Sequence, residues 1–141
     1  MAQSDSKKVL EYEHFLNNKL REDLRVTLEN RNKILFDIAE YLELKTFVEK
    51  LLINNDEKIT TKLDLGCNFY AQAVVKDTKK IFISIGFGFF LEMTPEEALK
   101  FIDEKCTYLN EQSDLLSKQC ISIKARIKLV LEGLRELQNI K

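Results

Sequence analysis

The sequence is poor in the residues that interrupt helices, with only four glycines and one proline in 141 residues. A chain of average composition would contain about ten glycines and about seven prolines. Because both residue types end or bend helices, their scarcity indicates long uninterrupted helices. It also argues against an all-β sandwich, which needs a turn about every ten residues. Disorder is disfavoured as well, since 45% of the residues are hydrophobic.

Cysteine is scarce too, and its three positions show no pairing pattern. Cys106 and Cys120 lie in one predicted helix, fourteen residues apart, which is roughly 21 Å at about 1.5 Å rise per residue. A disulfide needs its Cα atoms within about 7 Å, so we expect reduced thiols and a reducing compartment. Cys67 lies at a predicted turn, and a redox-active thiol enzyme is one alternative that these cysteines leave open.

Groups that carry out catalysis do not stand out in the sequence. The single histidine, His14, lies in a predicted long helix that offers no pocket. Neither paired carboxylates, a nucleophile beside a base, nor a cluster of metal ligands rises above background. We therefore predict a protein that is not an enzyme and that needs no metal or cofactor.

Neither sign of charge is in excess, because 22 basic and 23 acidic residues give a formal net charge of -1. This balance gives no electrostatic reason to expect direct contact with nucleic acid or an anionic membrane. No apolar run approaches the roughly 18 residues of a membrane span, and residues 1–8 are too polar for a signal peptide. We expect a protein of the cytoplasm and nucleus.

Two long segments show helical spacing of apolar residues. The first, about residues 6–55, contains no glycine or proline, with Ser4, Asp5 or Ser6 as candidate N-caps. Its apolar stripe consists of Leu16, Leu20, Leu24, Leu28, Ile34, Ile38, Tyr41, Val48 and Leu52, with Leu35 and Leu42 beside it. Steps of three and four are those of an amphipathic helix.

The second helical segment, residues 94–140, has the clearer start and the more regular repeat. Thr94 suits an N-cap, Pro95 the first helical position, and Glu97 the reciprocal position of a capping box. Steps of three and four then alternate without a break through Leu99, Ile102, Cys106, Leu109, Ser113, Leu116, Cys120, Ile123, Ile127, Val130, Leu134 and Leu137. A heptad repeat of this length predicts a coiled coil.

Residues 57–93 change to a period of two and are rich in β-branched and aromatic residues, which predicts strands. Gly66 with Asn68 marks one hairpin turn, while Gly86 and Gly88 mark a bulge or a break between two strands. The pattern predicts four short strands in two hairpins.

These elements predict an α+β fold in a single domain, residues 1–141, with two long helices forming an antiparallel coiled coil joined by two β-hairpins. Two helices of similar length with a compact link favour folding back on each other. Two hairpins alone would expose strand edges and apolar surface to water. We therefore expect the sheet to be completed by other subunits in an obligate oligomer.

The sequence resembles the prefoldin α-type subunits in its order of helix, two hairpins and helix. Residues 81–92, Thr94 and 96–102 carry the resemblance to the last hairpin and second helix of that family. Residues 63–69 and 131–138 are similar to an unconventional member of the family. The first hairpin departs from ordinary α-type subunits, which usually have a Ser/Thr-rich turn where Gly66-Cys67-Asn68 stands here.

The resemblance implies a jellyfish-shaped hexamer of two α-type and four β-type subunits, which holds unfolded clients without ATP. For the unconventional member it implies a complex around the unconventional prefoldin interactor. It also implies a role as a transcriptional cofactor, so the alternative is an adaptor that binds transcription regulators without holding clients. Self-association of the isolated chain is a further expectation.

The resemblance also assigns residues to two surfaces. The predicted oligomer interface on the hairpins consists of Leu63, Leu65, Phe69, Ile83, Ile85, Phe87 and Phe89. The predicted client or partner tips of the coiled coil consist of Val9, Leu10, Tyr12, Leu131, Leu134 and Leu137.

Overall fold

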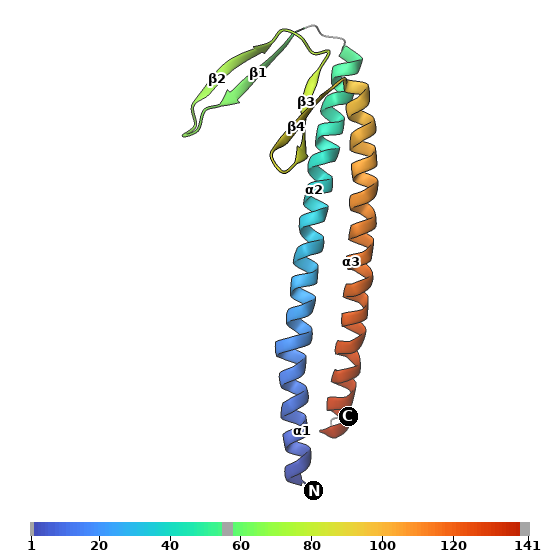
Figure 1. Cartoon of the computed structure of the whole chain (residues 1–141). Helices are drawn as coiled ribbons and strands as arrows, with labels where there is room; N and C mark the ends of the chain where they lie inside the picture. The colour runs from blue at the N-terminus through green and yellow to red at the C-terminus, as the bar shows by residue number, and fades with distance from the viewer. Residues whose placement is uncertain (1, 55–57, 139–141) are drawn as a thin grey trace. The chain divides into compact units, whose positions relative to one another are not determined.

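The computed structural model describes residues 2–54 and 58–138. Its elements follow the predicted order (Figure 1): α1 (Ala2–Phe15), η1 (Leu16–Leu20), α2 (Arg21–Asn54), β1 (Ile59–Asp64), β2 (Tyr70–Val75), β3 (Ile81–Gly86), β4 (Phe89–Met93) and α3 (Pro95–Leu137). The backbone forms two compact units, residues 1–38 with 108–141, and residues 39–107. Whether the chain acts as one domain stays a prediction.

In the first unit, α1 and η1 pack antiparallel against the last part of α3. Leu16, Leu20 and Leu134 are buried there, and Val9, Ile127 and Val130 pack against them. The Gln138 side chain donates a hydrogen bond to Glu13 over 3.3 Å, which places the end of α3 beside α1. The direction predicted for the coiled coil is therefore confirmed in this unit.

The π-helical element η1 has a cause in the sequence. Leu16, Leu20 and Leu24 are separated by two consecutive steps of four, whereas a heptad repeat alternates three and four. Such an insertion locally unwinds a coiled coil, and a π-turn, being wider than an α-turn, absorbs it. As a result Leu16 and Leu20 both stay buried.

The heptad repeat of α3 also agrees with the observed burial. All of its predicted inward positions from Leu99 to Leu134 are buried or half-buried. Ser113 is among the buried ones, so a serine is tolerated in the stripe. Leu137, the last position of the repeat, is exposed.

The core of the second unit joins α2, the hairpin β3–β4 and α3. Its buried residues are Val48, Ile83, Met93, Ala98, Ile102 and Cys106. Lys45 lies in the apolar stripe of α2, and its Nζ is 2.7 Å from Oδ1 of Asp103 on α3. This pair keeps a charged group tolerable beside the core.

The predicted capping box at the start of α3 is confirmed. The Thr94 N–H donates to Oε2 of Glu97 over 2.9 Å, and the Glu97 N–H donates to Oγ1 of Thr94 over 3.3 Å. Pro95 occupies the first helical position, where its missing N–H costs no hydrogen bond.

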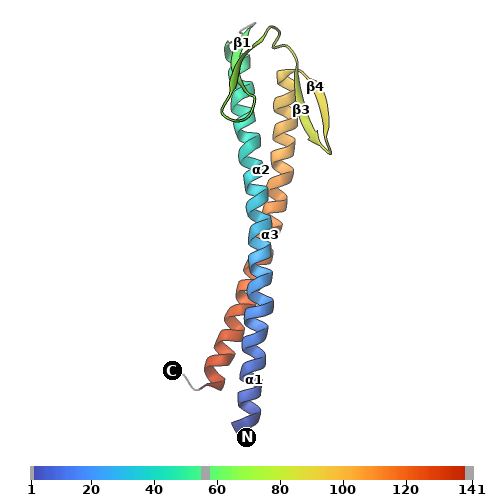
Figure 2. The same ribbon diagram turned by 90° about the vertical axis from the view of Figure 1, so that its left-hand side faces the viewer.

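Each hairpin is a separate two-stranded antiparallel sheet, β1 with β2 and β3 with β4 (Figure 2). In the first turn the Leu65 N–H donates to the Phe69 carbonyl, and Gly66, Cys67 and Asn68 all have positive φ. The second turn has positive φ at Gly86, Phe87 and Gly88, with a register shift between Ser84 and Gly86. The prediction of four strands in two hairpins is confirmed.

The first helix differs at its ends from the sequence-based expectation. It begins at Ala2, so Ser4, Asp5 and Ser6 lie within the helix and do not precede it as caps. It ends at Asn54, close to the end predicted for the segment of about residues 6–55, and residues 55–57 lie outside the described residues. Within the described chain, no helix is long and apolar enough to cross a membrane.

Candidate functional site

The candidate sites of this chain are apolar surfaces. The described residues hold no group of three or more His, Cys, Asp or Glu side chains placed to bind a metal ion. Large hydrophobic side chains are instead exposed on both hairpins and near the tips of the helices. Such exposed apolar patches commonly mark sites of protein association.

The hairpin β3–β4 carries apolar side chains on both of its faces, and on the outer face Phe82 pairs with Glu92 and Phe90 with Ser84. Ile83 pairs with Leu91 and Ile81 with Met93 on the face that packs into the core of the second unit. Side chains alternate along a strand, so Phe82 and Phe90 point to the opposite face. They are 70% and 66% exposed, and no described residue of this chain covers them.

The turn of this hairpin extends the exposed apolar surface. Phe87 sits at its tip with its side chain fully exposed and a φ of 52°. Ile85, Phe89 and Leu91, on either side of the turn, are exposed as well. The hairpin therefore offers a continuous apolar tip in addition to its outer face.

The hairpin β1–β2 has one apolar and one mixed face. Its register places Leu63 opposite Ala71 and Ile59 opposite Val75 on the apolar face. The other face carries Lys62 opposite Gln72, together with Thr60, Asp64, Tyr70 and Val74. At its base an apolar groove of about 320 Å³ is lined by residues including Phe47, Leu51, Val75 and Ile81.

The structure exposes six of the seven residues predicted for the oligomer interface. Leu63, Leu65, Phe69, Ile85, Phe87 and Phe89 are all on the surface. Ile83 is only 4% exposed, because it packs against Val48 and Ile102 of its own chain, and it is removed from the interface set. Contact of the six exposed residues with a partner stays a prediction.

Phe82 and Phe90 were missed by the sequence-based interface set. Their signal was visible, since 81–83 and 89–91 are runs of three consecutive apolar residues. In a strand with one solvent-exposed face, apolar and polar residues alternate, whereas consecutive apolar residues indicate burial on both faces. The period-two pattern selected one face and passed over the other.

The predicted tip residues also include both exposed and buried positions. Leu10, Tyr12, Leu131 and Leu137 are exposed, and Val9 is half-buried. Leu134 is 7% exposed and packs against Leu16 and Leu20, so its assignment to a binding surface is corrected to a core position. Phe15 and Leu129 are exposed nearby and belong to the tip surface.

A groove of about 480 Å³ lies between α1 and α3 at the tip of the first unit, and we call it the tip groove. It is lined by Tyr12, Leu129, Val130, Gly133, Glu136 and Leu137. Leu129 and Leu137, which are both exposed, therefore line the same groove.

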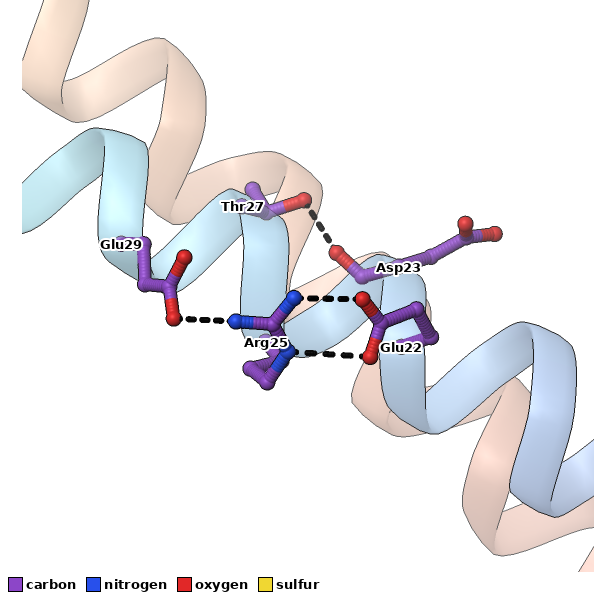
Figure 3. A network of polar contacts seen from close by, with 5 residues as sticks. All are labelled: Glu22, Asp23, Arg25, Thr27 and Glu29. Carbon is purple, nitrogen blue, oxygen red and sulfur yellow. Dashed lines mark hydrogen bonds and ion pairs between the residues drawn. The ribbon is translucent and has the colours of Figure 1, made fainter.

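The polar network on the surface of α2 does not form a site (Figure 3). The guanidinium of Arg25 donates to both carboxylate oxygens of Glu22, with Nε–Oε2 at 2.9 Å, and to Glu29 one turn further on. Thr27 Oγ1 donates to the Asp23 carbonyl over 2.7 Å. The hydrogen bonds from Arg25 lower the pKa of Glu22. These exposed contacts lie along one helix and stabilise it modestly.

The cysteines lend no support to a thiol enzyme. Burial raises the pKa of the Cys106 thiol, with the Asp103 carboxylate adding to the effect, so this thiol stays protonated and unreactive. Cys120 is buried and Cys67 is exposed at the first hairpin turn, and all three are free. The pKa of Lys45 is raised by its hydrogen bond to Asp103, as expected for a structural pair.

Comparison with known proteins identifies the family. The prefoldin subunit family profile matches residues 20–139. Protein UXT of Bos taurus is 45% identical over 140 residues, covering 99% of this chain and 90% of the relative. Protein UXT of Homo sapiens is 45% identical over 140 residues, covering 99% and 89%. The chain belongs to the prefoldin family.

The resemblance to an unconventional α-type member is also confirmed, since the relatives named Protein UXT are the ubiquitously expressed transcript protein. Among solved structures, filamentous PFD from Methanocaldococcus jannaschii has a TM-score of 0.60 at 18% identity, covering 82% of this chain and 98% of that chain. At this identity the likeness supports the α+β prefoldin fold alone. The family consists of non-catalytic, chaperone-like proteins that assemble as hetero-oligomers.

Proposed function

We propose that the chain is a subunit of a heteromeric prefoldin-like co-chaperone that works without ATP in the cytoplasm and nucleus. Its hairpins assemble the body of the oligomer, together with α-type and β-type subunits that include the unconventional prefoldin interactor. Its coiled-coil tips bind client or partner proteins. It is not an enzyme, and it contacts neither nucleic acid nor membrane directly.

The observation that carries this proposal is the exposure of aromatic side chains on β3–β4. Phe82, Phe87, Phe89 and Phe90 are all at least 66% exposed in the isolated chain. Burying a side chain of this size stabilises by about 1.5–3 kcal/mol, and exposing four together is costly for a monomer. A partner subunit that covers them removes this cost.

Native mass spectrometry of the tagged chain with β-type prefoldin subunits tests the proposal. We expect a defined hetero-oligomer, and we expect Phe87→Asp or Phe89→Asp to abolish it while circular dichroism shows intact helices. A stable monomer that ignores β-type subunits would contradict the proposal. Co-elution of both aspartate variants with partners would show that the interface lies elsewhere.

The alternative is an adaptor that binds transcription regulators without holding clients. An aggregation-suppression assay with an unfolded substrate separates the two functions. Protection that disappears when both tips are trimmed favours the co-chaperone. Absence of protection in a correctly assembled complex favours the adaptor.

A further inference from the structure

The tip groove has a regular row of residues along α3. Leu129, Gly133 and Leu137 follow one another at steps of four, so they lie on nearly the same side of the helix and span about 12 Å, or about two helical turns. Tyr12 of α1 closes the opposite side of the groove. Leu129 is 68% exposed, and the apolar row is therefore open to another molecule.

Gly133 creates a gap in the middle of this row. A Cβ atom added there would meet nothing within 4 Å, and the residue has no positive φ that would require glycine. Glycine within a helix costs about 0.5–1 kcal/mol relative to alanine. The gap has the size and position to receive a side chain from outside the chain.

Glu136 supplies the only charge among the residues that line the groove. Its carboxylate makes no hydrogen bond or ion pair with any described residue of the chain. A basic group on the occupant would complement it, as charged groups at the rim of an interface commonly do.

The secondary structure of the walls indicates the conformation of the occupant. Both walls are helices, whose backbone groups pair within the helix except in the last turn of α3, so the groove offers no strand edge to an extended chain. An extended peptide would leave its own N–H and C=O groups unpaired against apolar side chains, which is unfavourable. A helix satisfies its own backbone and can pack its side chains between those of α1 and α3.

We propose that the tip groove binds an amphipathic helix of about two turns, as a third helix against α1 and α3. Two apolar side chains one turn apart enter beside Leu129 and over Gly133, and a Lys or Arg one turn beyond pairs with Glu136. This inference rests on the proposed partner-binding role of the tips and names the class of segment that they recognise.

Fluorescence anisotropy with two labelled peptides tests this directly on the full chain. The first probe is a lactam-bridged helical peptide with Leu at i and i+4 and Arg at i+7, and the second is its linear counterpart with a central Pro. We expect saturable binding of the helical probe and at least tenfold weaker binding of the Pro probe. Gly133→Leu, which fills the gap, should weaken the helical probe at least tenfold, while Lys124→Leu, an exposed position on the opposite side of α3, should leave it unchanged.

A charge exchange tests the role of Glu136. Glu136→Arg should weaken the Arg probe roughly threefold, the size expected of an exposed ion pair, and a Glu probe should recover that loss. Equal binding of the helical and Pro probes, no binding of either, or insensitivity to Gly133→Leu would each overturn the inference. Co-elution with β-type subunits tests the proposed assembly through the hairpins independently of this inference. Gly133→Leu should leave that co-elution intact.

Discussion

The two hairpins are both antiparallel and have strands of five or six residues, yet they present different surfaces. In β3–β4 one face packs into the core of its own unit, and the other carries the exposed Phe82 and Phe90 beside Glu92 and Ser84. In β1–β2 one face is apolar and the other mixes Lys62 and Gln72 with Val74. The inner face of β3–β4 is therefore covered by its own chain, whereas Phe82 and Phe90 on its outer face are exposed.

The largest expected effect separates the inner face of β3–β4 from its outer face. Ile83→Asp places an unpaired carboxylate at a site that is 4% exposed, which costs several kcal/mol. We expect the second unit to lose its fold, seen as loss of hydrogen-exchange protection in residues 81–106. A protected core in this variant would show that β3–β4 does not depend on its contact with the helices.

Ser84→Asp is the matched control, since Ser84 pairs with Phe90 on the outer face and is exposed. It adds the same charge one residue away. We expect the isolated chain to keep its hydrogen-exchange protection, so the two aspartates should differ in effect although they are adjacent in sequence.

A second expectation concerns the outer faces of the two hairpins. The double variant Phe82→Ser with Phe90→Ser removes two exposed aromatic side chains, the residue type that dominates binding energy at interfaces. We expect affinity for β-type subunits, measured by biolayer interferometry, to fall at least tenfold, with the helical content unchanged.

The corresponding double variant on β1–β2 is Tyr70→Ser with Val74→Ser, on the face shared with Lys62. We expect a loss of threefold or less, because this pair contains one aromatic side chain, whereas Phe82 and Phe90 contribute two. Equal losses from the two pairs would remove the distinction between the hairpins.

Several features of the fold could be predicted because they depend on residues close in sequence. The capping box needs only Thr94 and Glu97, and the first turn was signalled by Gly66 and Asn68, which tolerate the positive φ that they adopt there. The inward stripe of α3 follows from its spacing alone. The π-turn at 16–20 also had a local signal in its two steps of four, although only the structure shows how the helix absorbs them.

The surfaces were harder to predict because periodicity gives the side of an element and not its neighbour. Ile83 and Leu134 were assigned to partner surfaces, and both are covered by their own chain. An apolar residue looks the same in sequence whether its cover comes from the same chain or from another. For the exposed Phe82 and Phe90, the proposed cover is a partner chain, which this sequence does not contain.

The smallest expected effect tests whether the two turns are equivalent although the faces differ. Gly66 has a φ of +88° and Gly86 a φ of +109°, and a Cβ at either would meet nothing within 4 Å. The cost of Gly66→Ala or Gly86→Ala is therefore conformational and not steric, about 1–2 kcal/mol for a left-handed backbone. Urea unfolding followed by circular dichroism should show similar decreases in the free energy of unfolding for both.

Gly133→Ala is the control, because the helical backbone at Gly133 suits alanine, and the free energy of unfolding of this variant should rise by about 0.5–1 kcal/mol. A loss confined to Gly86→Ala would mean that the bulged turn of β3–β4 stabilises the isolated chain, whereas the turn of β1–β2 does so only after assembly.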